Sequence, residues 1–328
     1  MYFTYKNNFF HGIMFHHLHN KDKHIKGQGS ISGNQFKKII NFIGKDNIIS
    51  PEKSLSLIKN KNNIYRKKIN KVCLTFDDAL KCQIDVALPI LNKLKLKAFF
   101  FVYSGIYSEK PELLEIHRYF RVNYFKNIDD FYKNFFDIII NYEPNIFLFI
   151  KSKQKLILEN KKKFPFYSIN DLKFRLVRDQ FLSISDYNNY MQIMFKIYNF
   201  QPKKILDKLF MTKSDIKHLI NNGHYVGLHS HSHPTFFESL TLKEQEKEYK
   251  DNINFLKSIS NRKNKFVSVA HPCGSYSYKT LQILNKLKIK IAFKNYLDNN
   301  FNNSKFKNLE IHRENHSLIL KKIKNIKI

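Results

Sequence analysis

The chain is short of cysteine and of long apolar runs. Cys73, Cys82 and Cys273 are the only cysteines among 328 residues. An odd number without the paired spacing of a metal site does not indicate a disulfide framework. Polar and charged residues are spread throughout residues 1–20, which leave no apolar segment of signal-peptide length, and no later segment is long enough to span a membrane. We therefore expect a cytoplasmic protein without a membrane span.

Acidic residues are also few, with 27 Asp and Glu against 57 Lys and Arg, which gives a formal net charge of +30. Such an excess ordinarily indicates an anionic partner such as nucleic acid, a membrane surface or an anionic glycan. Here it is mostly Lys scattered through a chain rich in Asn, Ile and Phe, a pattern that we attribute to biased base composition of the gene. No Arg-rich groove element, helix-turn-helix signal or Cys-rich finger accompanies it. We predict no specific nucleic-acid partner and leave peripheral contact with an anionic surface open.

A short apolar segment, 225–228, ends in alternating histidines. His229 and His233 are four residues apart, so one turn of coiling after a strand places both rings on the same side. Two neutral imidazoles are a common half of a zinc site. A catalytic zinc usually takes a third protein ligand and keeps one position for water. The pair therefore calls for a further ligand elsewhere in the chain.

A second apolar segment, 72–76, runs directly into Asp77 and Asp78. A parallel strand delivers the side chains that follow it to the carboxyl end of its sheet. Two adjacent carboxylates repel each other, and the pair is chemically consistent when one binds a metal and the other serves as a base. Alone, such a pair is usually a solvated turn, and a histidine pair is usually surface or core. The strand-end position of both motifs favours a site.

Strand-like and helical patterns alternate around these motifs. Segment 72–76, a helical pattern over 86–94 and segment 98–102 form a βαβ unit, and its continuous apolar strands imply burial on both faces. Further alternation with polar residues at strand ends predicts an α/β fold, a distorted (β/α) barrel. Residues 107–210 instead carry aromatic and basic residues at helical spacing. We expect the first part of the barrel in 1–106, a helical insertion in 107–210 and the second part in 211–328.

Two interpretations of the insertion are open. It either forms a lid or substrate wall beside the site, or packs its amphipathic helices on the barrel, and for any single aromatic residue we favour packing.

The two motifs together resemble the polysaccharide deacetylases with a NodB homology domain. In that family a T-F-D-D motif supplies the catalytic base and then a metal-ligating Asp, and an H-S/T-x-x-H motif supplies two His. By this resemblance Asp77 is the base, and Asp78, His229 and His233 hold Zn²⁺ or another divalent metal. The resemblance implies a NodB-type barrel and a carbohydrate N-deacetylase, a hydrolase that removes N-acetyl groups from an amino sugar in a glycan or glycan precursor.

A third segment resembles the family's R-P-P-Y-G motif, in which the Arg orients the catalytic Asp and a backbone N–H helps to form the oxyanion hole. His271 falls near the Arg position and Cys273 replaces the Tyr, so the resemblance implies a backbone donor at Cys273. Some branches of the family carry the Arg later, and Arg313 is our candidate. The family's general acid is a His near the end of the domain, where His312 fits best and His316 is the second choice.

Other features depart from the family pattern. The chain has no Trp, so the family's fourth motif, which is built on Trp, is absent. Ala79 replaces the usual Gly after the Asp pair, which strains the turn if that position needs positive φ. An apolar run near the N-terminus carries His11, His16, His17 and His19. These imidazoles either face the same cleft or are structural, and we favour the structural role because no fixed spacing demands a metal.

Two alternatives to sugar deacetylation follow from the same residues. A related metal-dependent hydrolase could cleave another C–N bond, such as a formamide or a cyclic imide. A catalytically inactive barrel could bind glycan without turnover, and the intact Asp and His motifs argue against it.

Overall fold

Seven short strands form one parallel sheet. The computed structural model describes residues 9–59, 69–108, 113–163, 168–260, 266–297 and 305–325. The sheet order is β8-β7-β6-β5-β4-β1-β9, and every neighbouring pair is parallel. The strands are β1 (His11–Phe15), β4 (Val72–Phe76), β5 (Phe99–Val102), β6 (Tyr225–Leu228), β7 (Ser268–Ala270), β8 (Ile291–Phe293) and β9 (Arg313–Asn315).

The two edges of this sheet meet. Phe293 of β8 forms a parallel bridge with Ile311, which lies just before β9. Lys294 N donates to Ile311 O at 2.8 Å, and Ile311 N donates to Ala292 O at 2.9 Å. These bonds nearly close the sheet into a cylinder, and the predicted (β/α) barrel is confirmed.

Apolar side chains from different strands fill one core. Phe10, Cys73, Phe99, Phe101 and Phe293 belong to a single cluster and are fully buried. All residues of β1, β4 and β5 are buried, as continuous apolar strands predict when helices cover the outer face. The core leaves the carboxyl ends of the strands as the place where polar side chains gather.

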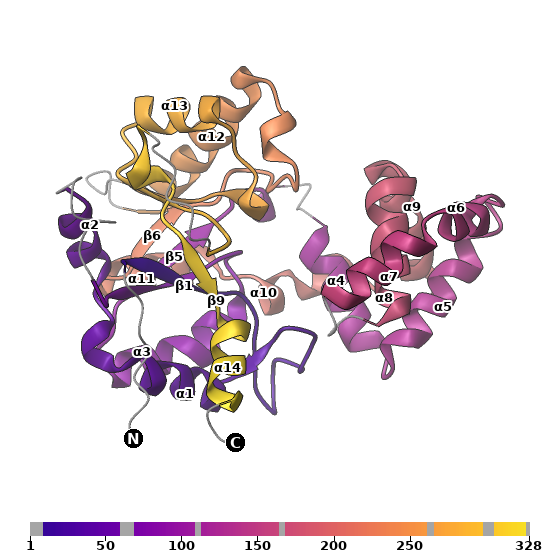
Figure 1. Cartoon of the computed structure of the whole chain (residues 1–328), viewed down its shortest axis with the longest axis horizontal. Helices are drawn as coiled ribbons and strands as arrows, with labels where there is room; N and C mark the ends of the chain where they lie inside the picture. The colour runs from indigo at the N-terminus through magenta and orange to yellow at the C-terminus, as the bar shows by residue number, and fades with distance from the viewer. Residues whose placement is uncertain are drawn as a thin grey trace. The chain divides into compact units, whose positions relative to one another are not determined.

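Helices cover the barrel, with α12 and α13 on one side of the strands and α1, α3 and α14 on the other (Figure 1). Two of the helices begin at a capping box, which Thr212 forms for α11 and Thr241 for α12. The elements are α1 (Gly33–Ile43), α2 (Pro51–Lys59), the π-helical η2 (Gln83–Ala87), α3 (Leu88–Lys93), α10 (Leu206–Leu209), α11 (Lys213–Asn221), α12 (Leu242–Ile259), α13 (Tyr278–Lys286) and α14 (His316–Asn325).

Short elements complete this part of the chain. Strands β2 (Leu18–His19) and β3 (Ile31–Ser32) form a separate two-stranded parallel sheet. The 3₁₀ turns are η1 (Lys45–Asn47), η3 (Gly105–Tyr107), η6 (Phe237–Ser239), η7 (Pro272–Gly274) and η8 (Lys307–Leu309). Within the described ranges, no helix combines the length and apolar character that crossing a bilayer requires.

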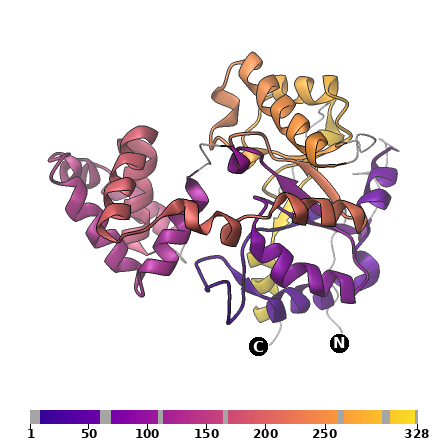
Figure 2. The same cartoon turned by 180° about the vertical axis from the view of Figure 1, so that it is seen from behind.

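The chain divides into two units, of which Met1–Glu112 with Leu206–Ile328 contains the barrel and Leu113–Ile205 is helical (Figure 2). The helical unit has a core of aromatic rings, including Phe120, Phe131 and Phe135, which are fully buried. Its elements are α4 (Leu114–Tyr124), α5 (Ile128–Ile139), α6 (Ile146–Ser152), α7 (Gln154–Lys163), α8 (Ile169–Leu176), the π-helical η4 (Val177–Phe181), α9 (Ile184–Ile197) and η5 (Pro202–Ile205).

Candidate active site

The loops after β4 and β6 turn sharply at the edge of the barrel. Asp78 has φ of 73° and Ala79 has φ of 50°, and Ser230 and His233 have φ of 64° and 54°. Left-handed backbone is costly for residues with a Cβ, and it persists where the surrounding structure holds it. Ala79 is held by its carbonyl, which accepts from Met211 N at 2.7 Å. Ala79 stands where the family usually has Gly, and the backbone at this position does adopt positive φ.

These turns bring three side chains together. His229 Nε2 lies 3.3 Å and His233 Nε2 lies 3.5 Å from Asp78 Oδ1, and the two Nε2 atoms are 3.2 Å apart. All three side chains are buried. Asp78 Oδ1 makes no hydrogen bond with any described residue. A buried carboxylate oxygen facing two imidazole nitrogens is the environment that a cation completes, and one carboxylate with two imidazoles is a common donor set for Zn²⁺. The residues therefore fit a divalent metal.

A backbone contact orients the first of these imidazoles. His229 Nδ1 lies 2.8 Å from the carbonyl oxygen of Ala270, the last residue of β7. With its proton on Nδ1, the ring donates to that carbonyl and directs the lone pair of Nε2 toward Asp78. Such a second contact sets the tautomer and orientation of a metal-binding histidine.

Helix α12 holds the loop between the two histidines. Glu248 Oε2 accepts from His231 N at 2.8 Å and from Ser232 N at 2.7 Å, and Glu248 Oε1 accepts from Ser232 Oγ at 2.7 Å. One turn later, Asn252 Oδ1 accepts from His229 N at 3.0 Å. Neither residue was predicted from the sequence, although their spacing of four within a long helix places them on one face.

Asp77 pairs with an arginine from the far end of the chain. Arg313 Nη1 lies 2.7 Å from Asp77 Oδ1, and Arg313 Nε donates to Lys294 O at 2.5 Å. Both side chains are buried. Burial alone would raise the pKa of Asp77, but the Arg313 guanidinium and the neighbouring imidazoles outweigh it and hold that pKa below its usual range. Asp77 is therefore held as a carboxylate with a fixed orientation.

The arginine reaches Asp77 because β1 leaves room for it. A Cβ on Gly12 would lie 3.0 Å from Arg313 Cγ and 3.2 Å from Thr75 Cγ2. Real Cβ atoms rarely come so close to other atoms, so the position favours glycine. His271, which stands nearest to the family's Arg in sequence, instead places Nε2 at 2.9 Å from Leu309 O and stacks on Tyr276. Arg313, not His271, contacts the carboxylate.

A histidine for which we favoured a structural role lies in the site. His16 Nε2 is 3.7 Å from Asp77 Oδ2 and 3.8 Å from Asp78 Oδ2, and its side chain is 31% exposed. It follows β1, whose last residue pairs with the last residue of β4, so His16 is level with Asp77. The preference for structural roles was wrong for His16. It agrees with the structure for His11, which is buried 3.1 Å from Phe9 O and whose pKa burial lowers to about 4.

The structure does not bring His312 to this group. The ring of His312 packs edge-on against Phe9, with ring centres 5.6 Å apart. Alternate side chains of an extended chain face opposite sides, so His312 points away from the side on which Arg313 meets Asp77. His316 has Nδ1 at 3.1 Å from Met14 O and Nε2 at 3.1 Å from Gly29 O, so backbone carbonyls occupy both ring nitrogens. His312 as general acid therefore stays a prediction, without a described contact to the Asp and His side chains in its support.

Cys273 follows β7, the strand next to β6. It lies in the turn η7 with φ of 50°, and Gly274 after it has φ of 73°. The carbonyl of Cys273 accepts from Asn295 Nδ2 at 2.8 Å. A Cβ on Gly274 would lie 2.2 Å from Asn295 Oδ1, so glycine is required by both space and φ. The turn is therefore held in one conformation, three residues after Ala270, whose carbonyl oxygen contacts His229.

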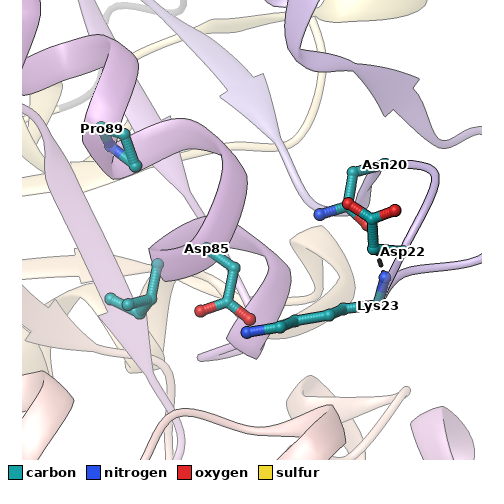
Figure 3. Close-up of a pocket in the computed structure, with 6 residues that line it drawn as sticks. Asn20, Asp22, Lys23, Asp85 and Pro89 are labelled. Carbon is teal, nitrogen blue, oxygen red and sulfur yellow. Dashed lines mark hydrogen bonds between the residues drawn. The ribbon is translucent and has the colours of Figure 1, made fainter.

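A pocket of about 340 Å³ lies against the helical segment formed by η2 and α3 (Figure 3). Asp85 and Pro89 form one wall, and Asn20, Asp22 and Lys23 lie on the loop that faces them. Gln83 begins this helix, and its Nε2 donates to Asp77 O at 2.6 Å. The pocket contains no member of the Asp and His group.

A parallel barrel with polar residues at the carboxyl ends of its strands is an architecture of enzymes. The family described as "Polysaccharide deacetylase" matches residues 65–119 and 171–292, more than half of the chain. The chain belongs to the polysaccharide deacetylase family. Its enzyme class is accordingly that of the carbohydrate N-deacetylases, which hydrolyse carbon–nitrogen bonds other than peptide bonds. His16, His312 and Arg313 lie outside the matched residues.

Solved structures share the fold at low identity. A Streptococcus pyogenes deacetylase, PplD, in complex with acetate is 16% identical, with 95% of this chain and 97% of that one covered and a TM-score of 0.53. IcaB from Ammonifex degensii is 13% identical, with 94% and 91% covered and a TM-score of 0.52. A de-N-acetylase from Aggregatibacter actinomycetemcomitans is 11% identical, with 96% and 98% covered and a TM-score of 0.52. No curated protein matches the sequence.

Proposed function

We propose that the protein is a metal-dependent hydrolase that removes N-acetyl groups from an amino sugar in a glycan or glycan precursor. The observation that carries this proposal is the convergence of Asp78, His229 and His233 beside a buried Asp77 that Arg313 holds in place. The deacetylases among the solved structures of the same fold support the choice of an acetyl group.

Asp78, His229 and His233 would hold the metal, for which Zn²⁺ suits the donor set, and when bound it supplies Lewis-acid polarisation of the acetamide carbonyl and of a water molecule. The chain's own residues supply the proton transfers. Asp77 takes the proton of the attacking water as general base, and Arg313 orients its carboxylate. The products are acetate and a free amino sugar.

The departing amine needs a proton, and we assign its donor to His16 in place of His312. His16 is close to both carboxylates and is partly open to solvent, so it can meet both the substrate and its proton source. The N–H of Cys273 remains our proposed hydrogen-bond donor to the oxyanion, since that role requires a backbone group rather than a particular side chain.

The test combines metal content with turnover. The purified protein is analysed for bound metal and assayed for acetate release from N-acetylated monosaccharides, oligosaccharides and nucleotide- or lipid-linked sugars, before and after chelation. Chelator-sensitive acetate release that Asp77→Asn abolishes supports the proposal. Activity retained in Asp77→Asn would overturn the assigned base. Metal binding with release of another acyl group, or with no turnover, would favour one of the two alternatives.

The place of the reaction is a separate proposal. A glycan precursor in the cytoplasm is the substrate that we favour, and fractionation of native cells with an antibody to the chain tests this location. Recovery of the protein from the culture medium would contradict it.

A further inference from the structure

The helical unit contains a cationic side chain, Arg121, that has no acidic partner among the described residues. Arg121 lies on α4, and its Nε is buried and makes no hydrogen bond with any described residue. Its guanidinium carbon lies 5.7 Å from the ring centre of Phe131 and 5.2 Å from that of Phe174. Aromatic faces attract a guanidinium, but they replace only part of the hydration that it loses on burial. The buried Nε–H therefore lacks a hydrogen-bond acceptor, and the half-buried guanidinium lacks a negatively charged partner among the described residues.

A buried histidine lies beside it. His117 is four residues before Arg121, so the two side chains share one face of α4. Both ring nitrogens of His117 are buried and form no hydrogen bond within the described residues. The ring packs edge-on against Tyr187, with centres 5.0 Å apart. Burial lowers the pKa of His117 to about 3, and nearby guanidiniums add to the effect, so the ring is neutral and retains one N–H to donate.

The nearby carboxylates already have cationic partners. Arg178, whose guanidinium carbon lies 5.7 Å from the centre of the Phe174 ring, bonds both oxygens of Asp179, at 2.6 and 2.9 Å. Asp171 accepts from Arg175 Nε at 2.7 Å. In the described part of the unit, Arg121 is thus left without a carboxylate while its neighbours are paired. An external anion would supply the missing charge.

We propose that Arg121, with His117 beside it and Arg178 on the same Phe174 ring, binds a small oxyanion group, either a phosphate or a carboxylate. The planar guanidinium presents paired N–H donors whose spacing matches the oxygens of both groups, and the neutral imidazole adds one more donor. The ligand class is thus an acidic small molecule, such as a sugar phosphate or a uronic acid. This site is separate from the deacetylation proposal and does not rest on it.

The experiment measures thermal unfolding and calorimetric binding of the full chain with inorganic phosphate, against chloride at equal ionic strength. Three variants are compared with the unmodified chain. Arg121→Met keeps the apolar contacts, and Arg121→Lys keeps the charge without the paired N–H donors of the guanidinium. Lys133→Met is a control at an exposed position on α5. Phosphate that binds at the Asp and His group of the barrel affects all these proteins equally. The difference between them isolates the helical unit.

We expect saturable stabilisation by phosphate in the unmodified chain and in Lys133→Met. Binding is expected to weaken at least about tenfold in Arg121→Lys and to disappear in Arg121→Met. In chloride, Arg121→Met should be no less stable than the unmodified chain, because it removes a half-buried charge that has no acidic partner among the described residues. If Arg121→Met fails to fold, Arg121→Lys carries the test. Equal responses to phosphate and chloride in the unmodified chain, or full phosphate binding in the folded Arg121 variants, would overturn the proposal.

Separate titrations with glucuronate and with a sugar phosphate identify the source of the oxyanion. Binding of either, lost in Arg121→Lys, supports the site and names its ligand class. Binding of neither, at concentrations where inorganic phosphate also fails, overturns it.

Discussion

Replacing Glu248 by Gln tests whether the loop between the two histidines must be held for metal binding. Glu248 lies on α12 and accepts three hydrogen bonds from that loop, two from the backbone N–H groups of His231 and Ser232 and one from the Ser232 hydroxyl. Gln has the same length and keeps an acceptor oxygen for the two N–H groups. Its amide can also face the Ser232 hydroxyl, which rotates to accept. The substitution therefore removes the charge with little change in shape.

The expected magnitude follows from the loss of charge. Hydrogen bonds to a charged group contribute about 1.5–3 kcal/mol each, against about 0.5–1.5 kcal/mol for neutral pairs. Ser232 is exposed, so water replaces part of the loss. We expect the ordered loop to lose about 2 kcal/mol in total, which corresponds to roughly 30-fold in metal affinity if only the ordered loop binds metal. This lies within the range of about 10- to 100-fold that is typical of residues supporting metal ligands.

The assay is competition for Zn²⁺ between the protein and a chromophoric chelator of known affinity. Glu246→Gln is the matched control, because Glu246 is on the same helix and, among the described residues, pairs only with Lys250 and Lys286, at 2.8 and 3.4 Å. Such surface pairs contribute little, so the control should bind Zn²⁺ as the unmodified chain does. Unchanged Zn²⁺ affinity in Glu248→Gln, or an equal loss in Glu246→Gln, would refute the idea that Glu248 holds the loop for the metal.

Three further predictions concern catalysis and stability. His16→Gln should lower kcat by on the order of 10²-fold or more while His312→Gln leaves it nearly unchanged, and steady-state acetate release with both variants tests this assignment, which equal losses would contradict. Gly12→Ala should destabilise the chain by about 1–3 kcal/mol and lower kcat, because its Cβ would displace Arg313; denaturant unfolding and kinetics measure both effects, and an unchanged variant would show that the barrel tolerates the Cβ. Acid should destabilise the fold, because burial lowers the pKa of several histidines while the unfolded chain binds protons below pH about 6.5. The contribution of these histidines to the free energy of unfolding is present in full above that pH. It declines by up to about 1.4 kcal/mol per histidine per pH unit as the pH falls toward 4. Urea unfolding between pH 8 and 5 should show this decline, and a flat profile would exclude it. The histidines are His11, His224, His271 and His316, with folded pKa values of about 4, and His117, with about 3.

Local patterns in the sequence were sufficient for the barrel and for part of its site. Continuous apolar segments predicted strands buried on both faces. Polar residues directly after two of them favoured a site at the strand ends, and the family resemblance assigned Asp78, His229 and His233 to it. The structure brings these three side chains within hydrogen-bonding range of one another. The prediction succeeded because the carboxyl ends of parallel strands share one edge, so the position of a residue relative to its own strand nearly determines its place.

The sequence by itself thus determined the alternating strands and helices and the residues that follow each strand. Tertiary structure decided which other side chains join them. The position of His16 beside Asp77 depends on the register between β1 and β4. The contact of Arg313 with Asp77 depends on closure of the barrel between β8 and β9. Register and closure depend on pairing between segments far apart in the chain, and a shift of one residue turns each side chain to the opposite face. For this reason Arg313 faces the site and His312, its neighbour in sequence, does not.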